Sequence, residues 1–292
     1  MTSHRVAHTS AFGLVLAFMA IFLVGHLGVL DLHAETGHAR RPAANGTAAP
    51  ARALRLGRVL FAPTFAAGTR LVTNDYAYFN PTAAGAARSF DWIVTSGSLF
   101  THNHAGWTGV PDSLQPDINS NSGTGSAIFR LVTRRRDFDT VAISFNLLNQ
   151  GYVTTQKTPA HAWDGVHLFL HYRSQHSLYA LTINRRDSTV LVKKKRPGGP
   201  ANGGTYTTLA PPVHYTPPLD RWQHILAVIT TNGNRTVTIT AYLNGKLLTS
   251  ATDTGADGPP LIGQGAIGLR GDNTQFQFRH FLIRALAGPR ST

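Results

Sequence analysis

The strongest constraint on the fold comes from residues 222–286, where three segments alternate apolar and polar side chains. They read WQHILAVI, TVTITAYLNGKLL and GAIGLRGDNTQFQFRHFLIRAL. A period of two places the apolar side chains on one face of a β-strand. Asn244 and Gly245 interrupt the second segment, and this pair is typical of a two-residue hairpin turn in which both residues have positive φ. The stretch predicts consecutive antiparallel strands with one buried face.

The order of these motifs resembles the closing strands of the concanavalin A-like lectin/glucanase superfamily. A strand that begins at Trp222, a Tyr-x-Asn-Gly hairpin at 242–245 and a GxIGL strand followed by FRxFxI at 265–283 succeed one another. The resemblance implies an all-β jelly-roll sandwich of two antiparallel sheets, a fold used to bind and cut polysaccharides. The last segment is also similar to 3-keto-disaccharide hydrolase and laminin G-like domains, although His280-Phe281 replaces the Asn-Ile of the hydrolases.

Composition supports an all-β chain. The sequence has 28 Gly, 16 Pro and no Cys, and helical periodicity is absent beyond the N-terminus. Many short strands and turns are typical of a sandwich or barrel. Without cysteine, neither a disulfide framework nor a thiolate metal site can form.

The N-terminus predicts export from the cytoplasm. Residues 11–30 carry no Asp, Glu, Lys or Arg, while Arg5 precedes them and Asp31 and Glu35 follow. This pattern indicates a hydrophobic helix with its start in the cytoplasm. Residues 1–34 are interpreted as either a cleaved signal peptide or a signal anchor, so the protein is expected to be secreted or membrane-anchored. The membrane is a partner if the helix is retained.

The remaining chain divides into two parts. Residues 35–58 are rich in Ala, Pro and Arg, a composition that predicts a flexible linker. Residues 59–292 are expected to form the jelly-roll domain. The segments 108–125 and 155–164 predict long loops, which often shape a binding cleft.

The central block, residues 164–196, predicts strands with one apolar face and one polar face. Alternation along the first strand sorts its side chains into an inner and an outer set. The inner set is Val166, Leu168, Leu170 and Tyr172, and the outer set is His167, Phe169, His171 and Arg173. On the third strand, Val190, Val192 and Lys194 oppose Leu191, Lys193 and Lys195. Such a polar face fits a polysaccharide platform, and it is also typical of a sheet face that is only solvated.

Eight residues are candidates for contact with a sugar. Six come from the central block and have polar or charged side chains. The other two are tryptophans in Gly-rich segments, because exposed indole rings stack on the apolar faces of sugars. The candidates are Trp107, Trp163, His167, His171, Arg173, Tyr179, Arg185 and Lys193.

The charge balance points to anionic partners. The chain has 27 Lys and Arg against 14 Asp and Glu, a formal net charge of +13. A basic exported surface attracts acidic polysaccharides, glycoconjugates or lipid headgroups. No nucleic-acid partner is expected, since no recognition helix or stacking module is visible.

The acidic residues argue against glycoside hydrolysis. Glycosidases generally use two carboxyl groups at a defined separation. Glu occurs once, at Glu35 in the linker, and the Glu-x-Asp-x-(x)-Glu signature of the superfamily's glucanases is absent. A polysaccharide lyase remains an alternative, because β-elimination needs a His or Tyr base and a cation to neutralise the uronate. The strings of the alginate-lyase-type jelly rolls are missing, so no catalytic residue is assigned.

No metal or cofactor is expected. Jelly rolls of this superfamily often bind a structural Ca²⁺ through an Asp in the last strand, and the resemblance aligns Arg279 and His280 with that position. His102 and His104 share a strand face in the predicted strand but have no evident third ligand. Asp253, Asp257 and Asp272 are interpreted as turn residues of Gly-rich loops.

Together these observations predict an extracytoplasmic carbohydrate-binding, lectin-like domain without catalytic activity, with an anionic polysaccharide as one candidate ligand. The alternatives are a lyase or keto-sugar hydrolase on the same fold and a structural protein of the cell envelope. The sequence specifies neither the sugar nor the oligomeric state.

Overall fold

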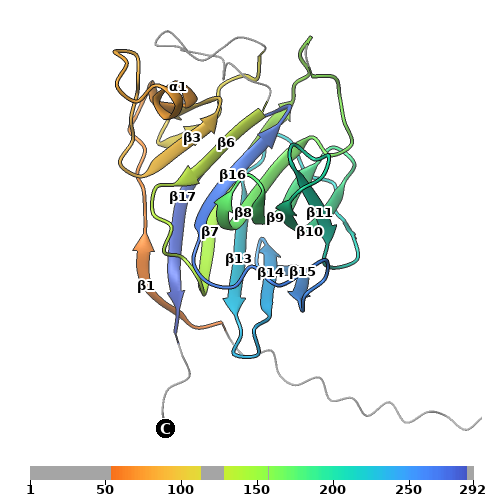
Figure 1. Ribbon diagram of the computed structural model, residues 1–292. Helices are drawn as coiled ribbons and strands as arrows, with labels where there is room; N and C mark the ends of the chain where they lie inside the picture. Colours follow the sequence, from red (N-terminus) through yellow and green to blue (C-terminus); the bar gives the residue numbers. More distant parts are fainter. Residues whose placement is uncertain (1–53, 113–127, 157, 288–292) are drawn as a thin grey trace, which may run out of the picture. The chain divides into compact units, whose positions relative to one another are not determined.

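Two antiparallel β-sheets pack face to face in the computed structural model, which describes residues 54–112, 128–156 and 158–287 (Figure 1). The predicted all-β sandwich of two antiparallel sheets is therefore confirmed. The first strand begins at Leu56, just before the predicted start of the domain. The predicted hydrophobic helix and most of the predicted linker lie outside the described residues. Within the described part, no helix is long and apolar enough to span a membrane.

The first sheet has nine strands in the order β15-β14-β13-β7-β17-β5-β4-β2, with β1 paired to β17. Its strands are β1 (Leu56–Phe61), β2 (Thr69–Asn74), β4 (Ser98–His102), β5 (Ala105–Trp107), β7 (Val141–Tyr152), β13 (Gln223–Thr231), β14 (Val237–Leu243), β15 (Lys246–Asp253) and β17 (Thr274–Leu286).

The second sheet has eight strands in the order β11-β10-β9-β8-β16-β6-β3, with β12 paired to β10. Its strands are β3 (Trp92–Ser96), β6 (Ile128–Thr133), β8 (Gly165–Ser174), β9 (Ser177–Arg185), β10 (Thr189–Pro197), β11 (Gly204–Thr208), β12 (Val213–His214) and β16 (Ala266–Asp272). The part of the chain that the structure describes has one short helix, α1 (Asp75–Phe79), which links β2 to the β3 region.

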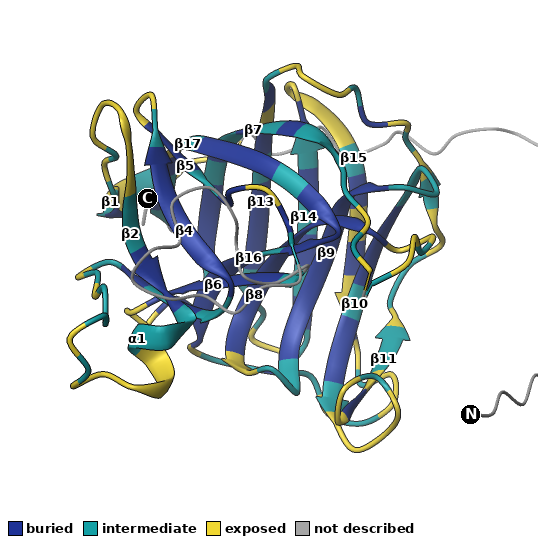
Figure 2. Cartoon of the chain, turned by 90° about the horizontal axis from the view of Figure 1, so that it is seen from above, coloured by how far each residue is buried: buried dark blue, intermediate teal, exposed yellow. Residues whose placement is uncertain are grey.

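The main core fills the space between the two sheets. Apolar side chains alternate along each strand, so one face of every central strand contributes to it. Figure 2 shows that β8, β9 and β10 are buried along most of their length. Core residues from the eight-stranded sheet include Leu168, Leu181, Val192 and Leu269, and those from the nine-stranded sheet include Ile143, Phe145, Ile239 and Phe278.

A second apolar cluster lies on the outer face of the eight-stranded sheet, away from the main core. Its members are Val132, Phe169, Tyr172, Leu178, Ala180 and Ala266. The face that the sequence predicted to be polar is thus partly apolar, and most of its side chains are shielded from solvent.

The predicted hairpin between β14 and β15 is present. Asn244 and Gly245 have φ values of 48° and 81°, and Leu243 pairs with Lys246 across the turn. Both turn residues therefore occupy the left-handed region that this two-residue turn requires.

The predicted alternation along β8 fails after Leu170. His171 has a positive φ of 44°, and the pairing of β8 with β9 and with β16 shifts register around it. This bulge inserts one residue, so the faces of the following side chains are exchanged. Tyr172 consequently joins the outer cluster with Phe169, whereas it was predicted to face inward.

Candidate functional site

The outer face of the eight-stranded sheet is hollowed into a pocket of about 580 Å³. This volume is in the range of small-molecule sites. The lining side chains come from β8, β9, β10, β11 and β16, from the loop before β8 and from the β10–β11 connection. We call this site the outer-face pocket, and its lining residues are Trp163, His167, Phe169, Ala180, Thr182, Arg185, Lys193, Lys195, Pro200, Ala201, Asn202, Tyr206, Arg270 and Asp272.

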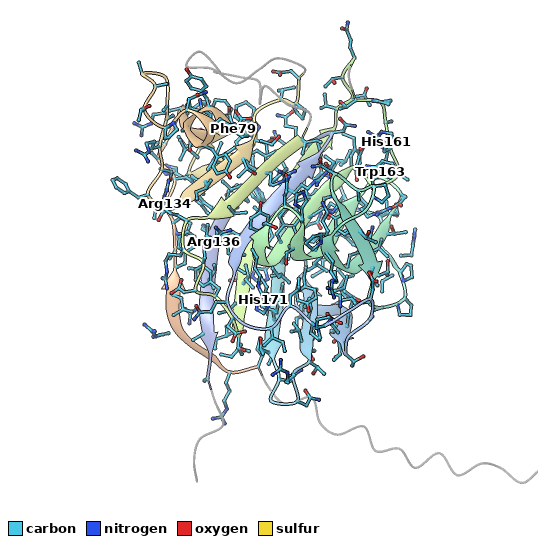
Figure 3. The ribbon with its side chains drawn as sticks, in the orientation of Figure 1. Phe79, Arg134, Arg136, His161, Trp163 and His171 are labelled. Carbon is cyan, nitrogen blue, oxygen red and sulfur yellow. The ribbon has the colours of Figure 1, made fainter. Side chains whose placement is uncertain are left out.

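An exposed tryptophan lies at the edge of the pocket. Trp163 belongs to the loop that precedes β8, and 51% of its surface is accessible. Its ring is stacked on His161, with the ring centroids 4.3 Å apart and an interplanar angle of 10°. Figure 3 shows the two rings side by side and His171 well away from them. Stacking on one face leaves the other indole face available to a flat apolar surface such as that of a sugar ring.

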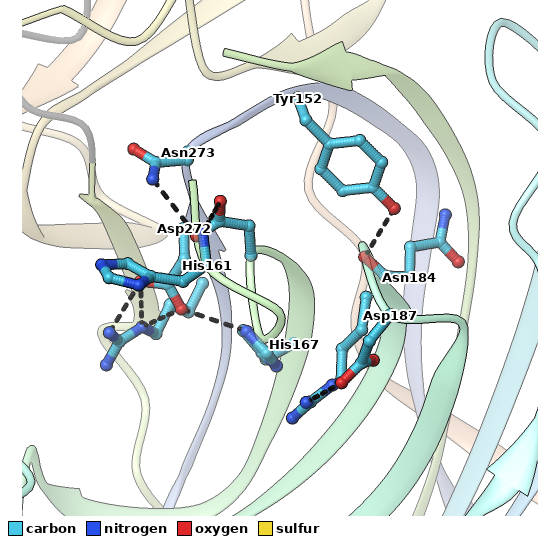
Figure 4. A network of polar contacts seen from close by, with 10 residues as sticks. Tyr152, His161, His167, Asn184, Asp187, Asp272 and Asn273 are labelled. Atoms are coloured by element: carbon cyan, nitrogen blue, oxygen red, sulfur yellow. Dashed lines mark hydrogen bonds and ion pairs between the residues drawn. The ribbon is translucent and has the colours of Figure 1, made fainter. Parts of the chain in front are cut away.

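A buried histidine–aspartate–arginine cluster forms part of the pocket wall. His167 Nε2 is 3.1 Å from Asp272 Oδ2, and the Arg270 guanidinium donates to both carboxylate oxygens of Asp272 at 2.7–2.9 Å. Figure 4 shows His167 directed at this carboxylate.

Burial and charge together set the protonation state of each side chain in this cluster. Burial alone favours the neutral acid, but Arg270 and His167 hold the pKa of Asp272 well below its usual range. Burial also lowers the pKa of His167, and this outweighs the opposing effect of Asp272. At neutral pH the cluster therefore combines a neutral imidazole with an ionised carboxylate and a guanidinium.

A second ion pair fixes another part of the wall. Arg185 donates to both oxygens of Asp187, and the Thr189 N–H and hydroxyl donate to Asp187 Oδ1 at 3.1 and 2.6 Å. The hydrogen bond from Arg185 is the largest of the effects that lower the pKa of Asp187 to about 2. Arg185 is thus held in place and its charge is largely balanced.

Two lysines of β10 share one tyrosine ring. Lys193 Nζ lies 5.7 Å and Lys195 Nζ 5.1 Å from the centroid of Tyr206 on β11, because Lys195 and Tyr206 are Cα partners in the ladder. These distances are in the range of cation–π contacts. The ring therefore helps to position both ammonium groups at the pocket.

Four of the eight predicted contact residues meet in this pocket. Trp163, His167, Arg185 and Lys193 all line it. They come from the loop before β8, from β8, from β9 and from β10. The alternation of side chains along the predicted strands placed His167 and Lys193 on the outer face. The Gly-rich segment around Trp163 indicated that this side chain is exposed.

The other four predicted residues lie elsewhere. Trp107 is on β5 in the nine-stranded sheet, next to the rings of Phe100 and His102. Arg173 is exposed and donates to the Ile262 carbonyl. None of the four belongs to the described lining of the outer-face pocket.

His171 and Tyr179 are fully buried. The bulge in β8 turns His171 toward the interior, where its ring nitrogens lie 2.9 Å from the Leu261 carbonyl oxygen and 2.8 Å from that of Asp139. Tyr179 packs in the main core, and its hydroxyl donates to Asp253 at 2.7 Å. Neither side chain is accessible to a ligand in this conformation.

Several pocket residues were not among the predicted contacts. Phe169 and Lys195 share the predicted outer face with His167 and Lys193, so the same alternation could have identified them. Asp272 was missed because it was interpreted as a loop residue, whereas it ends β16. Arg270 lay in a predicted strand, but it was not considered as a contact residue. Tyr206 had no distinctive sequence signal.

The described residues contain no group of three His, Cys, Asp or Glu side chains that could hold a metal ion. His102 is hydrogen-bonded to Thr69 at 2.7 Å. Asp253 and Asp272, interpreted as loop residues from the sequence, lie at the ends of β15 and β16, where lysine and arginine side chains engage them.

Comparisons with known proteins add a likeness of fold. The sequence matches no protein-family model and no curated protein. Among solved structures it is similar to a protein of unknown function with a galectin-like fold from Bacillus subtilis, with 10% identity, a TM-score of 0.49 and coverage of 81% of this chain and 100% of that one.

Two further solved structures are similar to the chain. One is the carbohydrate binding module CBM66 from Bacillus subtilis, with 10% identity, a TM-score of 0.45 and coverage of 66% of this chain and 95% of that one. The other is an endo-β-1,3-glucanase from Pyrococcus furiosus, with 9% identity, a TM-score of 0.47 and coverage of 80% and 95%. These are likenesses of fold alone.

Proposed function

We propose that this chain is an extracytoplasmic carbohydrate-binding protein that takes a sugar into the outer-face pocket without cleaving it. The observation that carries the proposal is the position of Trp163. Its ring is half exposed, is held by stacking on His161 and stands at a pocket of small-molecule size. Exposed aromatic rings beside convergent polar groups are what a sugar-binding site needs.

The polar groups of the pocket support the same proposal. His167, Thr182, Asn202 and Tyr206 offer hydrogen-bonding groups that can meet sugar hydroxyls. The ion pairs of Arg185 and Arg270 fix two further side chains before any ligand arrives. A pocket whose walls are already ordered loses less conformational entropy when it binds.

We expect replacement of Trp163 by alanine to weaken polysaccharide binding by about 10-fold or more, the effect of removing one well-placed aromatic contact. The measurement is a titration of the full chain with a panel of neutral and acidic polysaccharides at low and high salt. The matched control is Phe90→Ala, because Phe90 is also aromatic and fully exposed but precedes β3, at the opposite edge of the sheet from β11.

The two variants separate the possible outcomes. Selective loss of affinity in Trp163→Ala supports the outer-face pocket. An equal loss of affinity in Trp163→Ala and Phe90→Ala would show that the sugar binds outside the outer-face pocket. Failure of the wild-type chain to bind any polysaccharide would favour a structural protein of the cell envelope.

A polysaccharide lyase is the second candidate, and the His167–Asp272 pair favours it. The lowered pKa of His167 keeps its imidazole neutral at pH 7, as a base that abstracts a proton must be. Arg270 and Lys195 lie in the same pocket, where a cation could neutralise a uronate. Ultraviolet absorbance of unsaturated sugar ends, present in the wild type and lost in His167→Gln, would identify this activity.

The proposed location rests on the sequence of the N-terminus. The uncharged residues 11–30, with Arg5 before them and Asp31 after them, support export by a signal peptide or a signal anchor. Fractionation of cells that produce the full chain would test this. Protein confined to the cytoplasm would contradict the proposal.

A further inference from the structure

The outer-face pocket is lined by a largely buried lysine, Lys195, that has no partner of opposite charge among the described residues. Only 2% of the surface of Lys195 is accessible, and the side chain lines the pocket. Among the described residues its ammonium group has no ion pair and no hydrogen bond, and its one close polar contact is the Tyr206 ring. Isolated charges are rarely buried, because transfer from water is costly unless the charge is paired.

The groups around Lys195 add to its positive charge. Arg130 on β6 and Arg270 on β16 both act electrostatically on Lys195. Arg270 is balanced by Asp272, whereas the side chain of Arg130 donates to the neutral Oε1 of Gln175 at 3.0 Å and has no ion pair among the described residues. Lys193, on the same face of β10, likewise has no ion pair among the described residues. His167 is neutral, so the cluster carries more cations than carboxylates.

Burial, followed by the effects of Arg270 and Arg130, lowers the pKa of Lys195 to about 8. Burial and Arg185 also lower the pKa of Lys193. Both shifts indicate ammonium groups that the surrounding side chains compensate poorly. An anion placed between them would relieve the desolvation and the repulsion together.

We propose that the outer-face pocket binds the oxyanion of an acidic sugar, a carboxylate or a sulfate, between Lys195 and Lys193. The inference rests on the proposed function, and it specifies the class of ligand: a sugar whose ring lies toward Trp163 and whose anionic group lies beside Tyr206. Charge-assisted hydrogen bonds from two ammonium groups would select this ligand over its neutral counterpart.

The test uses the full chain and two pairs of polymers that differ only in charge. Polygalacturonate is compared with its methyl ester, and dextran sulfate with dextran, so that the carboxylate and the sulfate are assayed separately. We expect the wild type to prefer one acidic member by about 10- to 100-fold, the effect of one or two hydrogen bonds to a charged group. The preference should disappear in Lys195→Met and persist in Lys246→Met, which removes the same charge from an exposed site on β15.

The outcomes distinguish this inference from the proposed function. Equal binding of acidic and neutral polymers, still dependent on Trp163, would overturn the inference and leave carbohydrate binding intact. An equal loss of the preference for the acidic polymer in Lys195→Met and Lys246→Met would also overturn the inference. The preference would then depend on the net charge of the protein and not on the pocket. Binding to no polymer would overturn both.

The pH dependence of the affinity for the acidic polymer is an independent test of the proposed anion site. Lys195 attracts an anion only in its ammonium form, so affinity should be steady near pH 7 and fall as the pH rises through about 8 to 9. Lys193, whose pKa is also lowered, adds to the fall as it loses its own proton. Of the other groups that face Lys195, Arg130, Arg270 and Asp272 stay charged and His167 stays neutral in this range, while burial raises the pKa of Tyr206. Lys195→Arg should bind with a smaller alkaline fall, and an unchanged fall in this variant would contradict the assignment.

Replacement of Lys195 by an apolar residue should stabilise the fold, although it weakens binding of the anion. Folding lowers the pKa of Lys195 from 10.5 to about 8, so the charged amine opposes folding fully below pH 8, and this effect is lost as the pH rises from about 8 to the ordinary lysine value. Lys195→Met should therefore raise the melting temperature of the ligand-free chain at pH 7 by about 2–4 °C. A lower melting temperature in this variant would show that Lys195 has a structural role instead.

Discussion

Replacement of Asp253 by asparagine is expected to lower the free energy of unfolding by about 3–5 kcal/mol, the typical cost of breaking a buried ion pair on one side. Lys194 on β10 and Asp253 on β15 are both fully buried, and Lys194 Nζ lies 3.0 Å from Asp253 Oδ2 and 3.1 Å from Oδ1. The pair joins the two sheets. The asparagine would leave the lysine charge in the interior without its counter-ion.

The surrounding hydrogen bonds explain why the site tolerates little adjustment. Lys194 also donates to the Gly258 carbonyl at 2.7 Å. Tyr179 donates to Asp253 Oδ2 at 2.7 Å and accepts from the Leu261 N–H at 2.9 Å. A change at Asp253 therefore disturbs contacts to β9 and to the segment that follows β15.

Denaturant unfolding of a short variant series measures this effect. The control is the double replacement of Lys194 by Met and Asp253 by Leu, which removes both charges and should recover much of the lost stability. An exposed ion pair contributes up to about 1 kcal/mol. A free energy of unfolding for Asp253→Asn that lies within this range of the wild-type value would contradict a buried ion pair.

The second large effect is expected at Gly165, the first residue of β8. Its φ is +143°, and a Cβ atom there would lie 1.7 Å from the Asn184 carbonyl oxygen on β9. Gly165→Ala combines backbone strain with an overlap against a rigid backbone atom, so we expect a loss of about 3 kcal/mol or more. Since Gly165 follows the Trp163 loop directly, affinity for polysaccharide should fall as well.

Gly151 provides a matched control for this substitution. Its φ is +146°, almost the same as that of Gly165, but no atom lies within 4 Å of a Cβ built there. Gly151→Ala should therefore cost only the conformational strain, about 1–2 kcal/mol. Equal losses in the two variants, measured by thermal unfolding, would show that the approach of Asn184 does not matter.

The strand pattern could be predicted from the sequence because it depends on local periodicity. The alternation in 222–286 and the Asn244-Gly245 turn identified the closing strands and their hairpin. On β10, the same rule separated the core-facing Lys194 from Lys193 and Lys195. These features require only that neighbouring side chains point to opposite faces.

The predictions that failed depend on tertiary contacts, which the alternation of side chains along a strand does not reveal. The bulge at His171 exchanges the faces of β8 with no Gly or Pro to mark it, so His171 was assigned to the wrong side. Alternation also gives no sign that Trp222, at the start of a predicted apolar strand, is only half-buried beneath the Arg279 guanidinium. Both outcomes depend on tertiary contacts.

The pocket itself depends on strand order. His167 on β8 meets Asp272 because β8 and β16 are neighbours, although the two residues are far apart in the sequence. Arg130 and Arg270 act electrostatically on Lys195 although β9 and β8 separate β10 from β16 and β6. Periodicity indicates which face a residue occupies, and it does not indicate which strands lie side by side.

The location of the sugar site can be tested by hydrogen exchange of the full chain, with and without an oligosaccharide of the polysaccharide that binds most tightly. We expect slower exchange in the loop before β8 and in the β10–β11 connection that carries Pro200 and Asn202, with no change in β13, β14 or β15 of the nine-stranded sheet. Protection confined to the nine-stranded sheet would contradict the assignment of the outer-face pocket. So would slower exchange that persists in Trp163→Ala at unchanged affinity.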